Sequence, residues 1–262
     1  MLPDIRNPFF PEILDGVTAS LADTEYQVLL GPGRNGEKEE ARVTEAMIDR
    51  GMDGIILVAP ISSRAHMERV GTAVPTVVVG RHGSSPAYDT VADDDVEGAA
   101  LVVGHLAGLG HRRIAHIEHH ETDPTRLTEM PNARRADGYR QAMRQHGLEE
   151  WIDVVSTSYT QDGGYRGTKE LLARPVRPTA VFAGADIVAG ADIVAVGVLE
   201  AVTEAGLSVP GDLSVAGYDN TTFAAFGPIS LTSVDQAGRE MGQNAVRLLL
   251  ERIADRPVRR SR

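Results

Sequence analysis

The chain has 262 residues, a formal net charge of −11 and no cysteine. The lack of cysteine excludes thiol catalysis, disulfides and thiolate metal sites, and the negative charge argues against nucleic-acid binding by this polypeptide alone. No apolar run reaches the about 18 residues that span a bilayer. The N-terminus also lacks a signal-peptide pattern, so we expect a cytoplasmic protein with no membrane partner.

Short runs rich in Val and Ile alternate with helix-length amphipathic segments along the whole chain. Buried, β-branched strands separated by helices are typical of a parallel, doubly wound α/β sheet. In that architecture ligands bind at the carboxyl ends of the strands. In chain order, the expected strands are 26–30, 54–59, 76–80, 89–93, 113–117, 154–158, 179–184, 213–218 and 231–234. The expected helices are 11–22, 38–50, 63–70, 96–109, 133–146, 163–173, 192–205 and 236–253.

No Gly/Ser-rich linker divides the chain, but two series of strand–helix units follow one another. The first series ends near His119, and the last helix returns after a short strand. We therefore predict two doubly wound parallel-sheet lobes with a ligand cleft between them. Residues 1–118 plus 236–254 would form the N-terminal lobe, and residues 119–235 the C-terminal lobe.

Three motifs could indicate a cofactor or a metal, and each has a simpler interpretation. The sequence GPGRNG at 31–36 has dinucleotide-fingerprint spacing, yet Pro32 removes a backbone donor, which favours a plain strand-to-helix turn. The sequence HIEHHET at 116–122 gathers imidazoles and carboxylates, but alternate strand residues point to opposite faces, which favours surface histidines. The acidic run 93–95 fits a loop at a strand end as well as it fits acid–base or magnesium chemistry. We expect no cofactor, no metal and no enzymatic activity.

Several segments together carry a resemblance to a known family. In chain order they are DIRNPFFPEILDGV (4–17), RGMDGIILVAP (50–60), VPTVVVGR (74–81), DDVEGAALVVGHLAGLGHRRIAHI (94–117), RRADGYRQAM (134–143), VPGDLSVAGYDN (209–220) and LTSVDQ (231–236). Their order and spacing resemble the effector-binding core of the lactose/galactose-repressor family of transcription regulators, whose fold is shared with periplasmic ribose-type binding proteins. The resemblance implies a homodimer that senses a small carbohydrate effector and closes around it. It also implies that operator DNA is reached only through a helix-turn-helix domain missing from this chain.

The resemblance further implies which side chains contact the effector. Two aromatic residues would line one wall and a third would stack on the ligand, while arginine, carboxylate and amide groups would bind its hydroxyls. Sugars suit such a set, because they offer vicinal hydroxyls and apolar faces. Taken singly, each of these residues also fits a core aromatic, a surface ion pair or a solvated helix start. The implied ligand-binding residues are Phe9, Phe10, Arg81, Arg135, Tyr159, Asp219 and Gln236.

The chain departs from the family pattern in three places. Gly80 stands where many relatives carry a carboxylate before the arginine, so one sugar contact is absent. The start at Met1 omits most of the first strand, which predicts exposed strand edges and a marginally stable, aggregation-prone polypeptide. The basic tail 256–262 stops where relatives continue, and we expect it to be a solvated terminus.

The hexamer GADIVA occurs twice in succession at residues 184–195. The second copy continues in register into the following helix, so the excess is six residues, which would add about 9 Å if helical. Ala185 or Ala191 replaces a polar contact that relatives make here, so the insertion could narrow the pocket. A tandem duplication tolerated in a loop explains it equally.

A sugar-binding component of an ABC transporter is the alternative interpretation, because it shares the fold. The segments GHRRIAHI (110–117) and VPGDLSVAGYDN (209–220) match the regulators better than the transport proteins. A helix-turn-helix upstream of Met1 would support regulation, whereas a signal peptide there would support transport.

Overall fold

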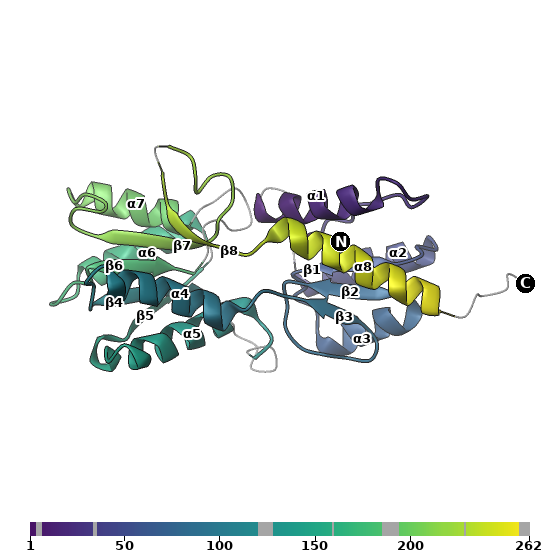
Figure 1. Ribbon diagram of the computed structural model, residues 1–262, viewed down its shortest axis with the longest axis horizontal. Coiled ribbons are helices and arrows are strands. Elements are labelled where there is room, and N and C mark those ends of the chain that lie inside the picture. Colours follow the sequence, from purple (N-terminus) through teal and green to yellow (C-terminus); the bar gives the residue numbers. More distant parts are fainter. Residues whose placement is uncertain are drawn as a thin grey trace, which may run out of the picture. The chain divides into compact units, whose positions relative to one another are not determined.

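The computed structural model describes residues 1–3, 7–33, 36–119, 128–158, 160–184, 194–227 and 229–256. The chain forms two compact units that it enters more than once. Unit 1 contains Met1–Ile5, Phe10–Ala92 and Ala237–Arg262, and unit 2 contains Arg6–Phe9 and Asp93–Gln236. Each unit has its own parallel sheet (Figure 1).

Unit 1 is built on a three-stranded parallel sheet in the order β1-β2-β3. All four residues of the central strand β2 are buried, as its unbroken run of β-branched residues predicts. The strands are β1 (Ile55–Val58), β2 (Thr76–Val79) and β3 (Asp89–Val91). The helices of this unit are α1 (Phe9–Leu21), α2 (Glu37–Asp49), α3 (Arg64–Ala73) and α8 (Gly238–Asp255).

Helices α1 and α8 cross at close range because each contributes a glycine to the contact. A Cβ atom at Gly16 would collide with the carbonyl oxygen of Arg239, and one at Gly242 would collide with that of Ile13. The small residues therefore set the separation of two helices whose sequences are more than 200 residues apart. Figure 1 shows the two helices side by side.

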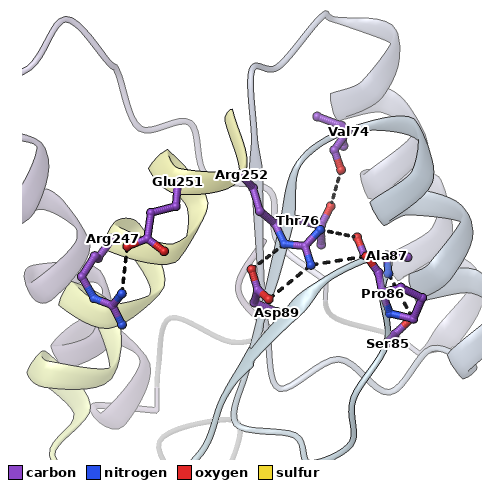
Figure 2. Close-up of polar contacts among 9 residues, drawn as sticks. All are labelled: Val74, Thr76, Ser85, Pro86, Ala87, Asp89, Arg247, Glu251 and Arg252. Atoms are coloured by element: carbon purple, nitrogen blue, oxygen red, sulfur yellow. Dashed lines mark hydrogen bonds and ion pairs between the residues drawn. The ribbon is translucent and has the colours of Figure 1, made fainter. Parts of the chain in front are cut away.

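Arg252 fastens the carboxyl end of α8 to the start of β3 (Figure 2). Its Nε donates to Asp89 Oδ2 at 2.5 Å and its Nη2 donates to Asp89 Oδ1 at 3.2 Å. The Nη1 group donates to the carbonyl of Ala87 at 3.2 Å. A fork of this kind is geometrically more specific than a single-point ammonium contact, so it fixes the helix along the sheet.

Unit 2 is built on a five-stranded parallel sheet in the order β5-β4-β6-β7-β8. The strands are β4 (Ile114–His119), β5 (Asp153–Thr157), β6 (Ala180–Ala183), β7 (Ser214–Asp219) and β8 (Thr232–Asp235). The helices are α4 (Asp95–Gly108), α5 (Pro131–Gln145), α6 (Gln161–Leu172) and α7 (Val194–Glu204), with a short 3-10 turn at Glu149–Trp151.

Alternate residues of the central strand β6 enter two different apolar clusters. Ala180 and Phe182 pack with residues of α4 and α5, whereas Val181 and Ala183 pack with residues of α6 and α7. Because successive strand residues point to opposite faces, both faces of this sheet are covered. The expected doubly wound α/β architecture is confirmed in this unit.

Eight of the expected strands and all the expected helices are present with slightly shifted ends. The expected strand at 26–30 is wrong, because these residues pair with no strand in the described structure and most of them are exposed. The chain also changes unit after Ala92 rather than near residue 118, because β4 pairs with β5 and β6 in the second sheet. Most of the GADIVA repeat and the tail from residue 257 lie outside the described residues.

Among the described helices, none combines the length and the apolar character that a membrane crossing requires.

Candidate functional site

The carboxyl ends of β7 and β8 bring two polar side chains together in unit 2. Asp219 is the last residue of β7, lies opposite Asp235 of β8 and has a positive φ of 118°. Gln236 follows directly after β8, and its Nε2 donates a hydrogen bond to Asp219 Oδ1. Both side chains are buried, so the pair is held in a low-dielectric position at the edge of the sheet where ligands bind in α/β folds.

Arg135 of helix α5 reaches the same edge of the sheet. Its Nε donates to Asp95 Oδ1 at 2.6 Å, and its Nη1 lies 3.9 Å from Asp219 Oδ1. The Nη1 group also donates to the carbonyl of Gly184 at 2.8 Å, where β6 ends. The guanidinium carbon sits 3.8 Å from the centre of the Tyr218 ring, so a cation–π contact orients it as well.

The acidic run before α4 supplies the remaining members of this cluster. Asp94 caps the helix by accepting from the backbone of Glu97, and Asp95 in the first turn is fully buried against Arg135. Asp93 accepts a hydrogen bond of 2.9 Å from the hydroxyl of Tyr218. The three acidic residues therefore have three different structural roles, and these roles cannot be distinguished from the sequence, where the residues are consecutive.

Electrostatics set the protonation of this cluster. Burial raises the pKa of the Asp93 carboxyl above its usual value, and the nearby charge of Asp95 raises it further, while Arg135 opposes both effects. Burial also raises the pKa of the Tyr218 hydroxyl far above its usual value, so this group stays a hydrogen-bond donor. The result is a neutral donor next to buried carboxylates and one guanidinium.

The cluster therefore combines groups that recognise hydroxyls. Carboxylates accept hydrogen bonds from them, while the guanidinium and the amide donate to their oxygens. We define the polar cluster as Asp93, Asp95, Arg135, Tyr218, Asp219 and Gln236. Of the residues expected from the sequence, the structure brings Arg135, Asp219 and Gln236 together here. Asp93, Asp95 and Tyr218 were missed as members, and their signal was the acidic run next to a helix start and the tyrosine directly before Asp219.

Arg81 lies in unit 1, after β2, and its side chain is buried next to backbone carbonyl groups of the same unit. Its Nη1 donates to the carbonyls of Pro60 at 3.2 Å and Ser62 at 2.5 Å. Gly80 adopts a φ of 69°, which turns the chain so that Arg81 can point inward. The arginine therefore fastens the loop after β1 to the end of β2, and its contact with a ligand stays a prediction.

The aromatic residues expected at the site have separate positions. Phe9 is buried at the start of α1, where its backbone N–H donates to Asn7 Oδ1 at 3.0 Å. Phe10 is half-buried in the same turn. Tyr159 lies outside the described residues. The ligand contacts of all three stay predictions.

The first residue of the histidine-rich motif, His116, lies in the core of unit 2. His116 is fully buried on β4 between the rings of Tyr139 and Phe182, with centroids 5.2 and 4.5 Å away. This position corrects the expectation of a surface histidine there. His119 Nδ1 approaches the Thr157 carbonyl at 3.2 Å, so it is occupied by neighbouring backbone. Within the described ranges, no three His, Asp or Glu side chains converge as a metal site would require.

Comparisons with known proteins bear on both units. A family described as a periplasmic binding protein-like domain matches residues 103–262. The ribose operon repressor of Escherichia coli (strain K12) is 33% identical over 261 residues, which cover 98% of this chain and 75% of the relative.

Two solved structures extend the likeness to the fold. A LacI transcriptional regulator from a Rhodococcus species superimposes with a TM-score of 0.87 at 30% identity and covers 97% of this chain and 90% of that one. A LacI family transcriptional regulator from Enterococcus faecium, solved with bound ribose, has a TM-score of 0.77 at 30% identity and covers 97% of this chain and 89% of that one.

Proposed function

Because the chain belongs to the LacI family of transcription regulators, we propose that it is the effector-sensing core of such a regulator and that its effector is a neutral sugar. The observation that carries the proposal is the polar cluster. Its Arg135, Asp219 and Gln236 side chains meet at the carboxyl edge of the unit 2 sheet.

The chemistry of the cluster supports a sugar in preference to an anion. One guanidinium faces the carboxyl groups of Asp93, Asp95 and Asp219, so acidic groups outnumber the basic group. A phosphate or carboxylate ligand would meet repulsion from these groups, whereas sugar hydroxyls can donate to carboxylates and accept from arginine. Ribose is the natural first ligand to test, because one similar structure was solved with it.

Sensing needs a coupling between the sugar and a second event. We propose that the protein acts without catalysis, as a homodimer in which the sugar changes subunit geometry and thereby operator affinity in a chain that carries a DNA-binding domain. The exposed Leu101 of α4 and the exposed Leu109 directly after it support a subunit contact on that helix. The likeness to transcription repressors supports regulation over the transport alternative.

Titration calorimetry with ribose tests the proposal. We expect ribose to bind and Asp219→Asn to weaken binding on the order of 10- to 100-fold, because charge-assisted hydrogen bonds contribute about 1.5–3 kcal/mol. Asp153→Asn is the matched control, since Asp153 is also a strand carboxylate of unit 2 but pairs with the surface residue Arg174. Ribose 5-phosphate should bind more weakly than ribose.

Two results would contradict the proposal. An Asp219→Asn variant that binds ribose as the Asp153→Asn variant does would remove the cluster from the site. Tighter binding of the phosphorylated sugar than of the neutral one would overturn the neutral-sugar assignment.

A further inference from the structure

Three arginines gather at the amino edge of the unit 2 sheet. Arg112 and Arg113 directly precede β4, and Arg177 lies shortly before β6. Because β4 and β6 are neighbouring parallel strands, the residues that precede them lie at the same edge of the sheet. Trp151 precedes β5, which pairs with β4 on its other side. Four side chains from three segments of the chain therefore meet at this edge.

Two contacts join these segments directly. The guanidinium carbon of Arg113 lies 5.8 Å from the centre of the Trp151 ring, within the range of a cation–π contact. The Nε group of Arg113 donates a hydrogen bond to the carbonyl of Arg177 at 2.8 Å. Arg113 thus lies between the tryptophan and the third arginine.

None of the three arginines forms an ion pair with any described carboxylate. The chain has 37 acidic and 26 basic residues, so acidic partners are plentiful. Exposed arginines elsewhere in the described chain do pair with carboxylates, and examples are Arg42, Arg69, Arg144, Arg166, Arg174 and Arg247. Three arginines without an acidic partner in one place are therefore a local exception in an acidic protein.

Carboxylates at the same end of unit 2 are used by other arginines. Asp153 at the start of β5 pairs with Arg174 at 3.3 Å, and Glu149 pairs with Arg144 at 3.3 Å. Glu150 is exposed and forms no ion pair with a described residue. The chain itself therefore leaves the charge of the three arginines uncompensated at this edge.

Backbone carbonyls hold two of the arginines in place and occupy only part of their hydrogen-bonding capacity. Arg112 Nη1 donates to the carbonyls of Ala107 and His111, both at 3.1 Å. Arg113 uses its Nε, and within the described ranges its two Nη groups have no acceptor. Each guanidinium has five N–H donors, so most of them remain available to a ligand. Groups that are already held in position lose less side-chain entropy when they bind.

Apolar surface lies beside these charges. Val176, directly before Arg177, is 58% exposed, and Trp151 is half-buried. Tryptophan and arginine are the residue types that most often dominate the binding energy of protein interfaces. We define the arginine patch as Arg112, Arg113, Trp151, Val176 and Arg177.

We propose that the arginine patch is a docking surface for an acidic, partly apolar peptide segment of a partner protein. Carboxylates of the segment would accept hydrogen bonds from the guanidinium groups, and its apolar side chains would cover Trp151 and Val176. A peptide fits better than a nucleic acid, because the chain has a net charge of −11 and three arginines neutralise few phosphates.

The patch is separate from the proposed sugar site. The polar cluster lies at the carboxyl edge of the unit 2 sheet, and the patch lies at the amino edge of the same sheet. The six residues of β4 span about 20 Å between these edges, at about 3.3 Å per residue. A failure of one proposal therefore leaves the other untouched.

Titration with a short acidic peptide tests the proposal. The probe is acetyl-Glu-Glu-Leu-Glu-Leu-Glu-Glu-amide, and the matched control peptide has glutamine in place of every glutamate. Trp151 is the single tryptophan of the chain, so a saturable change in its emission reports binding at the patch. We expect this change with the acidic peptide only, and we expect it to weaken when sodium chloride rises from about 50 mM to about 500 mM.

Arginine variants locate the binding site. Arg113→Gln should weaken binding of the fluorescein-labelled acidic peptide, measured by anisotropy, by about 10-fold. Arg177→Gln should weaken it in the same direction, and it removes a side chain that makes no hydrogen bond with a described residue, so the fold should be unaffected. Arg166→Gln is the matched control, because Arg166 is an exposed arginine of the same unit that pairs with Asp162.

Four results would overturn the proposal. The first is the absence of a saturable signal up to about 1 mM acidic peptide. The second is equal binding of the glutamate and glutamine peptides. The third is an equal effect of Arg177→Gln and Arg166→Gln, which would show a general response to charge. The fourth is tighter, patch-dependent binding of a duplex DNA of random sequence, which would assign the surface to nucleic acid instead.

Discussion

Replacing Arg135 by methionine should destabilise unit 2 strongly. The Arg135 and Asp95 side chains are 6% and 0% exposed and lie 2.6 Å apart, so the substitution leaves a buried carboxylate without its main counter-ion. Removing one partner of a buried ion pair costs about 3–5 kcal/mol of unfolding free energy. With a urea dependence of about 2 kcal/mol per molar, the unfolding midpoint should fall by roughly 2 M.

The single tryptophan, Trp151, makes this measurement specific to unit 2. It packs against the apolar cluster of α4 and α5, so its emission in a urea titration reports the unfolding of the unit that contains Arg135. Arg144→Met is the matched control on the same helix, because its exposed pair with Glu149 should contribute less than about 1 kcal/mol. In the Asp95→Asn background, Arg135→Met should cost less than it does alone. An Arg135→Met midpoint equal to that of Arg144→Met would refute the reasoning.

Two further predictions concern unit 2 and use the same fluorescence assay. Burial lowers the pKa of His116 from 6.5 to about 3, so its contribution to stability is complete above pH 6.5 and is lost as the pH falls towards 3. Between pH 7 and 5 the free energy of unfolding should fall by about 2 kcal/mol, at about 1.4 kcal/mol per pH unit below 6.5. His116→Phe should abolish this part of the pH dependence. An unchanged pH profile in the variant would contradict the assignment. Gly164→Ala on α6 should destabilise the unit by about 1–3 kcal/mol, because the new Cβ would collide with the carbonyl of Val194. Gly108→Ala, whose Cβ would meet open space on α4, should be neutral or stabilising; equal midpoints for the two alanine variants would contradict the close-approach argument.

The sheet of unit 2 could be predicted from the sequence because its pattern is local. Strands such as 180–183 are short and wholly apolar, and the segments between them have the length and periodicity of helices. The boundary between the units is not local. Strand β4 continues the same strand–helix alternation as β2 and β3, and only its pairing with β5 and β6 assigns it to the second sheet.

The segment 26–30 shows where a local pattern fails. Its sequence YQVLL contains an aromatic, a β-branched and two further apolar residues, which is a composition found in strands. A strand also requires a neighbour with which to pair, and among the described residues the parallel partner near this segment is the two-residue stretch Met1–Leu2, which reaches Pro32. Strand propensity therefore identified an extended segment correctly. Residues 26–30 nevertheless form no strand, because no ladder partner lies along them in the described structure.

At the site, residue types were easier to anticipate than pairings. Arg135, Asp219 and Gln236 were expected as polar contacts, and the structure brings them together at one sheet edge. The pairing of Arg135 with Asp95 joins residues 40 positions apart. Nothing in the acidic run 93–95 distinguishes the capping residue from the buried counter-ion, since that depends on where the helix axis begins.

The charge balance of the cluster follows from this same arrangement. Arg135 is needed as the counter-ion of Asp95, so its positive charge is largely compensated before any ligand arrives. Asp219 then adds a buried carboxyl group 3.9 Å from the guanidinium, and Asp93 adds one whose pKa burial raises. A ligand that brings negative charge would have to overcome this excess of acidic groups, whereas a polyol brings donors that acidic oxygens accept. The fold therefore uses one arginine both to stabilise unit 2 and to balance part of the acidic charge of the cluster, which is the basis of the neutral-sugar proposal.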